Sequence, residues 1–232
     1  MSEFNEELFR LVSSLKSRLE LLGESGMTYL PKSEENIEKM PYSTSDNNDC
    51  LEALKIKLSN CEKCKLYQTR TNVVFGTGNR HAKLIFVGEA PGRDEDLSGE
   101  PFVGRAGQLL TKMIEAMGLK REDVYICNVV KCRPPKNRDP EIDEIAACEP
   151  FLKQQLSLIK PQIIVGLGRY ACQTLLQTKV AMSKIRGEWH EYEGIDFMPT
   201  FHPAYLLRNP PAKKEVWQDL QQVMAKISSQ QS

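Results

Sequence analysis

The chain has 232 residues, and its 31 basic side chains equal its 31 acidic side chains in number. Hydrophobic residues make up 41% and charged residues 27%, which is typical of a globular protein with one domain of moderate size. No run approaches the roughly 18 apolar residues that a membrane span needs, which excludes a membrane-spanning chain. The acidic start, MSEFNEELFR, lacks the apolar core of an export signal, so we expect a cytoplasmic protein.

The charges are divided unevenly along the chain. Residues 1–60 carry 7 basic and 11 acidic side chains, and residues 61–232 carry 24 and 20. Apolar side chains recur at helical spacing over residues 4–22, and the segment that follows is rich in Ser, Glu, Asn and Pro, as linkers are. We predict a helical extension with its linker over residues 1–48 and one domain over residues 49–232. The extension is either a solvated appendage or a helix that docks a protein partner.

Short apolar runs alternate with amphipathic segments through the rest of the chain. This alternation predicts an α/β fold with a mostly parallel sheet covered by helices on both faces. In such folds the functional sites form at the carboxyl ends of the strands. Asp139, followed by Pro140, is expected to open the longest helix. The predicted helices cover residues 49–59, 108–117, 139–159, 170–176 and 213–228, and the predicted strands cover residues 83–88, 124–130 and 162–166, with a hairpin within 187–200.

The seven cysteines indicate a metal site better than a disulfide framework. Their number is odd and no export signal precedes them. Cys61 and Cys64 have the C-x2-C spacing that lets one tight turn supply two thiolates to a metal. Cys132 and Cys148, with fifteen residues between them, would supply two more. The spacing does not distinguish a zinc site from an iron–sulfur cluster, and it also allows all four to be ordinary cysteines that bind no metal. The other cysteines are Cys50, Cys127 and Cys172.

Polar and aromatic residues follow the first two predicted strands. Glu89 lies in a loop with glycines on either side, which let a backbone approach a ligand closely. Phe102 follows it and is either a core residue or a platform on which a base stacks. Asn128 ends the second strand, where its amide either ties down a loop or reads the edge of a base through one donor and one acceptor.

A second polar segment lies near the C-terminus. His202 precedes a proline at the expected end of a strand, where a lone histidine is more often structural than functional. Leu206 and Arg208 follow it, and such a pair can wedge into a base stack and hold a phosphate. The alternative interpretation of this segment is the plain start of a helix.

Several separated segments resemble the motifs of family 4 uracil-DNA glycosylases, iron–sulfur enzymes of the uracil-DNA glycosylase superfamily. The resemblance covers about residues 58–228 and leaves the N-terminal extension outside it. It implies a three-layer α/β/α sandwich and an enzyme that flips uracil out of DNA and hydrolyses its N-glycosidic bond, leaving an abasic site in base excision repair. The motifs are residues 88–92 (GEAPG), 101–104 (PFVG), Asn128, 131–135 (KCRPP) and 202–208 (HPAYLLR).

The resemblance also implies a role for each matched residue. Glu89, Asn128 and His202 would be catalytic, Phe102 would stack on uracil, and Glu95 would crowd the C5 position and exclude thymine. A [4Fe–4S] cluster would be held by Cys61, Cys64, Cys132 and Cys148. The substrate-binding set would be Gly88, Glu89, Ala90, Glu95, Phe102, Asn128 and His202, and the DNA contacts would come from Arg133, Lys136, Leu206 and Arg208.

We expect the cluster to act as a staple that holds a basic segment, including Lys131 and Arg138, at the DNA backbone. The expected partner is uracil-containing DNA, single- or double-stranded, bound by a monomer associated with the nucleoid. Three alternatives stay open from the residues themselves. They are a glycosylase of the same superfamily for another deaminated base such as hypoxanthine, a non-enzymatic iron–sulfur module that binds nucleic acid, and a redox protein.

Overall fold

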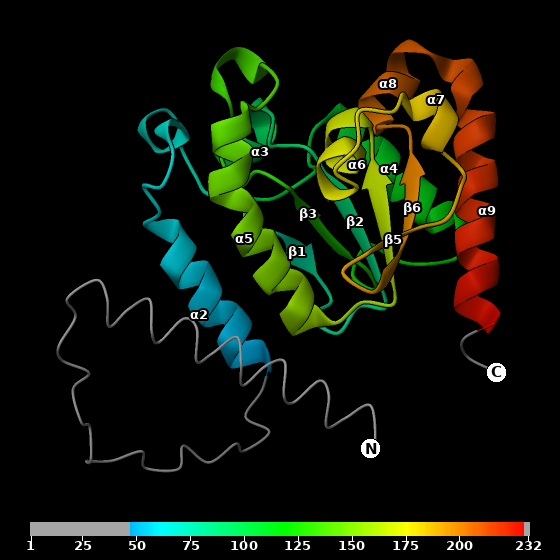
Figure 1. The fold of residues 1–232 in the computed structure, drawn as a ribbon, viewed down its shortest axis with the longest axis horizontal. Coiled ribbons are helices and arrows are strands. Elements are labelled where there is room, and N and C mark those ends of the chain that lie inside the picture. The colour runs from blue at the N-terminus through cyan, green and yellow to red at the C-terminus, as the bar shows by residue number, and fades with distance from the viewer. Residues whose placement is uncertain (1–46, 230–232) are drawn as a thin grey trace, which may run out of the picture. The chain divides into compact units, whose positions relative to one another are not determined.

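A computed structural model describes residues 47–229 of the chain (Figure 1). The helix predicted over residues 4–22 and the linker up to residue 46 lie outside these described residues. None of the described helices is long and apolar enough to cross a membrane.

The described domain is built on one six-stranded sheet with the strand order β1-β3-β2-β4-β6-β5. The four central strands, β3, β2, β4 and β6, run parallel to one another, and the edge strands β1 and β5 pair antiparallel with their neighbours. The parallel arrangement places the carboxyl ends of four strands along one edge. The strands are β1 (Thr77–Gly78), β2 (Leu84–Gly88), β3 (Tyr125–Asn128), β4 (Ile163–Leu167), β5 (His190–Tyr192) and β6 (Ile195–Thr200).

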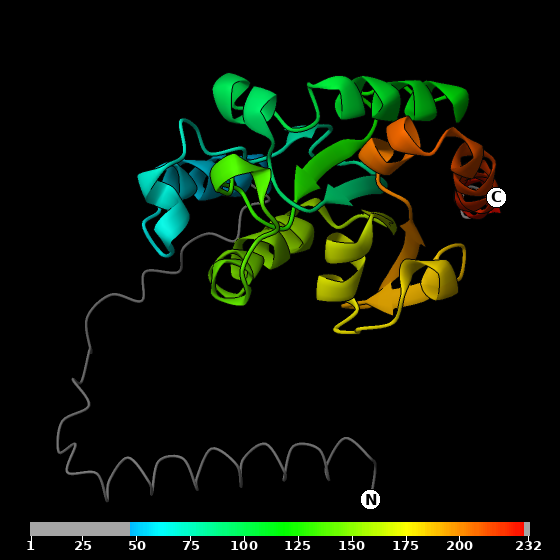
Figure 2. The same cartoon turned by 90° about the horizontal axis from the view of Figure 1, so that it is seen from above.

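Helices cover both faces of the sheet, as seen from above in Figure 2. Side chains alternate along β2, so Leu84 and Phe86 pack with α4, α8 and α9, while Ile85 and Val87 pack with α2, α5 and α6. The predicted three-layer α/β/α fold is therefore confirmed. The helices are α2 (Asn47–Ser59), α3 (Arg93–Ser98), α4 (Arg105–Ala116), α5 (Ile142–Ile159), α6 (Arg169–Leu175), α7 (Met182–Ile185), α8 (Pro203–Arg208) and α9 (Lys213–Ser229), with 3-10 turns η1 (Lys65–Gln68), η2 (Pro135–Asn137) and η3 (Pro210–Ala212).

The predicted strands, the hairpin and most of the predicted helices are present within a few residues of their expected ends. The start of α5 is different, because Asp139 does not open it. Glu144 accepts a hydrogen bond from the N–H of Glu141 at 2.8 Å and pairs with the Arg138 guanidinium, so these acidic residues satisfy the helix start instead. Asp139 lies outside the helix and lines the functional site described below.

Candidate active site

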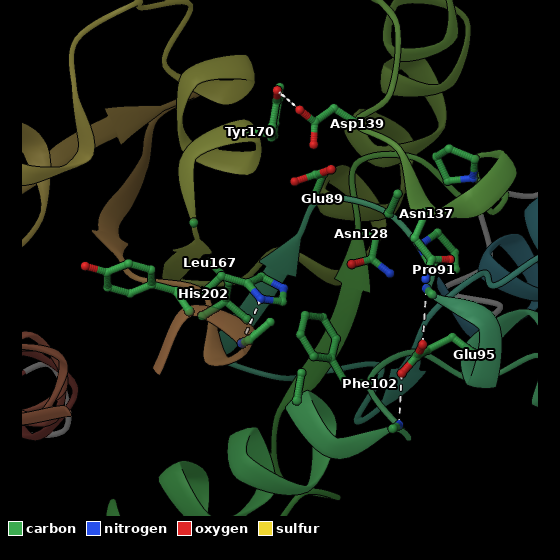
Figure 3. A pocket seen from close by; sticks show the side chains of 18 of the residues that line it. Glu89, Pro91, Glu95, Phe102, Asn128, Asn137, Asp139, Leu167, Tyr170 and His202 are labelled. Atoms are coloured by element: carbon green, nitrogen blue, oxygen red, sulfur yellow. Dashed lines mark hydrogen bonds between the residues drawn. The ribbon is translucent and has the colours of Figure 1, made fainter. Parts of the chain in front are cut away.

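A cleft of about 950 Å³ opens at the carboxyl ends of the parallel strands (Figure 3). Its walls come from the loops that follow β2, β3, β4 and β6, four segments far apart in the sequence. Glu89 follows β2, Asn128 ends β3, and His202 follows β6. The sheet thus brings together the three residues that the sequence analysis singled out, at the edge where a site was expected.

Phe102 and Asn128 pack side by side over Gly88, the last residue of β2. A Cβ atom at Gly88 would overlap both Asn128 Oδ1 and the Phe102 ring, so only glycine fits beneath them. Phe102 has a φ of 54°, a left-handed conformation that is uncommon outside glycine. Its ring centre lies 5.5 Å from that of His202, with the ring planes 32° apart. The backbone is thus held in a costly conformation that places an aromatic face in the cleft.

Asn128 presents an unsatisfied acceptor to this cleft. Its side chain is 1% exposed, and its Oδ1 has no hydrogen-bond partner among the described residues. Leaving a buried acceptor unpaired costs about 1–3 kcal/mol. Figure 3 shows the amide directed into the space between Glu89 and Phe102. A ligand that donates a hydrogen bond there would recover this cost.

Glu89 lies at the mouth of β2 with its carboxylate in the cleft (Figure 3). Loss of hydration raises the pKa of Glu89 to about 7, the nearby Asp139 carboxylate adds to the rise, and Arg169 opposes it. Asp139 accepts a hydrogen bond from the Tyr170 hydroxyl, and its Oδ2 lies 3.7 Å from Arg169 Nη2. Sequence reasoning missed Asp139 and Tyr170 as site residues, since only the fold brings the start of α5 to the start of α6.

His202 is held in one tautomer by the backbone that follows it. Its Nδ1 accepts a hydrogen bond from the N–H of Ala204 at 3.1 Å, so His202 caps helix α8. An accepting Nδ1 carries no proton, and the neutral ring therefore has its proton on Nε2. Burial lowers the pKa of His202 to about 4, with a further contribution from the Arg208 charge. Near neutral pH this residue offers the cleft an uncharged N–H donor.

Glu95 lies on α3, and its carboxylate fixes the loop that carries Phe102. Its Oε1 accepts from the N–H groups of Val103 and Gly104, both at 3.0 Å, and its Oε2 accepts from the N–H of Gly92 at 3.1 Å. This side chain therefore joins the loop after β2 to the loop before α4. Glu95 and Ala90 also line the cleft. Their contact with a bound base stays a prediction.

Leu206 is not available as a wedge for DNA. It is 1% exposed and packs in the core beneath α8, because α8 turns this side chain toward the sheet. Its neighbours Tyr205 and Leu207 are 37% and 39% exposed. Arg208, at the end of the same helix, is exposed and lines the cleft. The prediction for Leu206 is therefore wrong, while that for Arg208 stays open.

The basic segment after β3 is only partly exposed. Lys136 is exposed on the turn η2, and Arg133 is half-buried, donating from Nε to Asn137 Oδ1 at 2.7 Å. Lys131, which we expected at the DNA backbone, is fully buried, and Arg138 is committed to Glu144. The expectation is wrong for Lys131, and contact between this segment and DNA stays a prediction for the exposed cations.

Among the four predicted metal ligands, Cys132 and Cys148 are buried in the apolar core that includes α2 and α5, and Cys61 and Cys64 pack against this core, partly buried. Burial raises the pKa of Cys64, Cys132 and Cys148, and the charge of neighbouring thiolates within the set raises each further. Arg70 Nη1 lies 3.4 Å from Cys132 Sγ, and the N–H of Lys131 lies 3.3 Å from Cys148 Sγ. Within residues 47–229 no group of three or more such side chains is spaced to hold a single metal ion.

The other three cysteines lie on β3, α6 and α2. Cys127 and Cys172 are buried, the former within β3 and the latter within α6, and Cys50 is exposed on α2. Burial raises the pKa of both buried thiols, which keeps them protonated near neutral pH.

Comparisons with known proteins show which family this chain resembles. A model of the uracil DNA glycosylase superfamily matches residues 75–221. The chain is 45% identical over 190 residues to a type-4 uracil-DNA glycosylase of Saccharolobus solfataricus, covering 78% of this chain and 88% of that protein. It is 49% identical over 163 residues to a type-4 uracil-DNA glycosylase of Thermotoga maritima, covering 69% and 85%. A type-5 uracil-DNA glycosylase of Pyrobaculum aerophilum is 32% identical over 146 residues, covering 56% and 64%.

Proposed function

This chain belongs to the uracil-DNA glycosylase superfamily, and we propose that its cleft binds a flipped uracil and hydrolyses the bond between that base and deoxyribose. The orphaned Oδ1 of Asn128 carries this proposal, because it requires a donor that enters the cleft. Relatives named type-4 uracil-DNA glycosylases at 45% and 49% identity support the activity. The product is DNA with an abasic site, the starting point of base excision repair.

Recognition of the base rests on Asn128 and Phe102. Asn128 Oδ1 accepts from uracil N3–H, and its amide nitrogen donates to uracil O4. Cytosine offers an acceptor at N3 and a donor at N4, so both hydrogen bonds would be lost and buried polar groups would face each other, at about 1–3 kcal/mol each. Phe102 supplies the face on which the flipped ring stacks.

The bond cleavage rests on Glu89 and His202. Breaking the N-glycosidic bond leaves positive charge on the sugar and negative charge on uracil. The Glu89 carboxylate stabilises the sugar cation and orients the attacking water, while His202 Nε2–H donates to uracil O2, where negative charge develops. A neutral histidine suffices for this, and the depressed pKa of His202 keeps it neutral at physiological pH.

The four clustered cysteines are suited to a [4Fe–4S] cluster. Two of the sulfurs, those of Cys132 and Cys148, already accept hydrogen bonds from N–H groups, as cluster thiolates do. The fold brings the two cysteine pairs near one another, since, beyond the effect of burial, charge on Cys61 and Cys64 raises the pKa of Cys132 and charge on Cys64 raises the pKa of Cys148. Bound there, the cluster supplies a structural cross-link between the turn at Cys61, the segment after β3 and helix α5.

DNA would approach along the cleft, where Arg208 is a lining residue and where Arg133 and Lys136 adjoin the lining residues Pro134 and Asn137 and offer cations to phosphates. In this proposal a monomer acts on uracil-containing DNA in the cytoplasm, at the nucleoid.

The proposed function is tested by base release from oligonucleotides that carry one modified or normal base. The panel contains uracil, thymine, cytosine and hypoxanthine, each in single- and double-stranded form, and release is read as strand cleavage after alkali. We expect release of uracil alone. Release of hypoxanthine in preference to uracil would assign the chain to another damaged base, and binding of DNA with no release of any base would contradict an enzymatic function.

A further inference from the structure

Lys131 is fully buried and has no carboxylate partner among the described residues. Its Nζ donates a hydrogen bond to the main-chain oxygen of Asn128 at 2.7 Å, and its own N–H lies 3.3 Å from Cys148 Sγ. One residue thus contacts both the base-reading position and a predicted cluster ligand. Burying an ammonium without a counter-charge is strongly unfavourable, so a negative group must lie nearby.

Four thiolates around a [4Fe–4S] core carry a net negative charge, and this is the counter-charge that the site lacks. Two predicted cluster ligands adjoin Lys131, namely Cys148, whose Sγ accepts from the Lys131 N–H, and Cys132, the next residue in the chain. With its charge balanced in this way, the same ammonium can keep its hydrogen bond to the main-chain oxygen of Asn128. The fold therefore places a fixed cation between the cysteine set and the uracil-reading amide.

We propose that Lys131 is a positioning residue that couples the metal centre to uracil recognition, with its ammonium balancing the charge of the cluster and fixing the end of β3 that carries Asn128. The inference rests on the proposed function, because it needs both a cluster and a uracil site. The end of β3 is also tied to the catalytic loop, since the N–H groups of Val129 and Val130 donate to the carbonyls of Gly88 and Glu89 at 2.9 and 3.0 Å. A displaced Asn128 would thus also disturb Glu89.

The test compares Lys131→Met with Gln155→Met. Methionine keeps the length of the lysine side chain and removes its charge and its donors. Gln155 is also fully buried and also donates to a main-chain oxygen, that of Phe75 at 2.9 Å, but it bonds neither Asn128 nor a cysteine. Lys131→Met loses the hydrogen bonds to the Asn128 carbonyl and the Cys127 thiol, and Gln155→Met loses those to the Phe75 carbonyl and, at 3.4 Å, the Tyr125 hydroxyl. A general loss of stability therefore affects both variants.

We expect Lys131→Met to move the reduction potential of the cluster to more negative values in a spectroscopic redox titration, because a nearby positive charge favours the reduced, more negative cluster. We also expect about tenfold weaker inhibition by free uracil, which reports binding separately from bond cleavage. Gln155→Met should leave both quantities at the wild-type values. Equal potentials and equal uracil inhibition in all three proteins would overturn the inference.

A second measurement on the wild-type protein decides the matter if Lys131→Met does not fold. Iron is removed in part with a chelator, and hydrogen exchange is followed at the N–H groups of Val129 and Val130, with strand β4 as the internal reference. Faster exchange at these two positions than in β4 supports the coupling, and equal change in both contradicts it. A wild-type protein that holds its cluster but releases no uracil would defeat the proposed function alone, since the shift in potential does not depend on the reaction.

Discussion

Glu89→Gln is expected to lower the rate of uracil release by about 10²–10⁴-fold, the usual contribution of a positioned acid or base. Glutamine has nearly the same shape as glutamate but lacks the charge that stabilises a sugar cation and attracts the proton of the attacking water. Since Glu89 is not needed to hold the base, uracil-containing DNA should still bind. The measurement is single-turnover base release beside binding affinity for the same oligonucleotide.

The pH dependence of the reaction provides an independent measure of Glu89. Its pKa is raised to about 7 by burial and by Asp139, and only the ionised form is active, so the rate should fall about tenfold for each pH unit below that value and level off above it. Asp139→Asn removes the like charge, which lowers the pKa of Glu89 and moves the falling limb to lower pH. In Glu89→Gln this limb should disappear.

The control for Glu89→Gln is Glu122→Gln, the same substitution at an exposed residue whose one ion pair within the described part of the chain is with Lys120. It should leave rate and pH profile unchanged. A wild-type rate in Glu89→Gln, or a limb that persists in it, would remove Glu89 from the catalytic role.

His202→Ala is expected to slow uracil release by about 10²–10³-fold, the cost of losing one donor to a developing oxyanion. The substitution also removes the cap of α8, since Nδ1 accepts from the N–H of Ala204. His202→Asn separates the two effects. Asparagine is a good N-cap, so it should restore thermal stability while the donor at the Nε2 position stays lost and the rate stays low.

His81→Ala is the matched control, because His81 is exposed and lies outside the cleft. Its rate and melting temperature should equal those of the wild type. If His202→Asn recovered both stability and full activity, His202 would act only as a helix cap.

Much of this site follows from the sequence because parallel strands share one carboxyl edge. The apolar runs that became β2 and β3 predicted where Glu89 and Asn128 would emerge, and His202 after β6 reached the same edge. Local patterns were enough here, since each residue needed only to end its own strand.

Other features depend on tertiary contacts that no local pattern encodes. Asp139 before Pro140 is typical of a helix start. In the structure Glu144, paired with Arg138, stabilises the start of α5 instead, and Asp139 accepts a hydrogen bond from the Tyr170 hydroxyl at the cleft. Leu206 lies on a helix too short to show which face is buried. Lys131 lies in a basic turn that favours exposure, and lysine is rarely fully buried without a partner.

The central claim is that Asn128 and Phe102 hold uracil in this cleft, and a crystal structure of the protein with uracil, or with DNA carrying a uracil, tests it most directly. The account predicts Asn128 Oδ1 within hydrogen-bond distance of uracil N3, the Phe102 ring against the base, and His202 Nε2 facing O2. Uracil bound elsewhere on the chain, or bound in the cleft with Asn128 Oδ1 still unpaired, would contradict it.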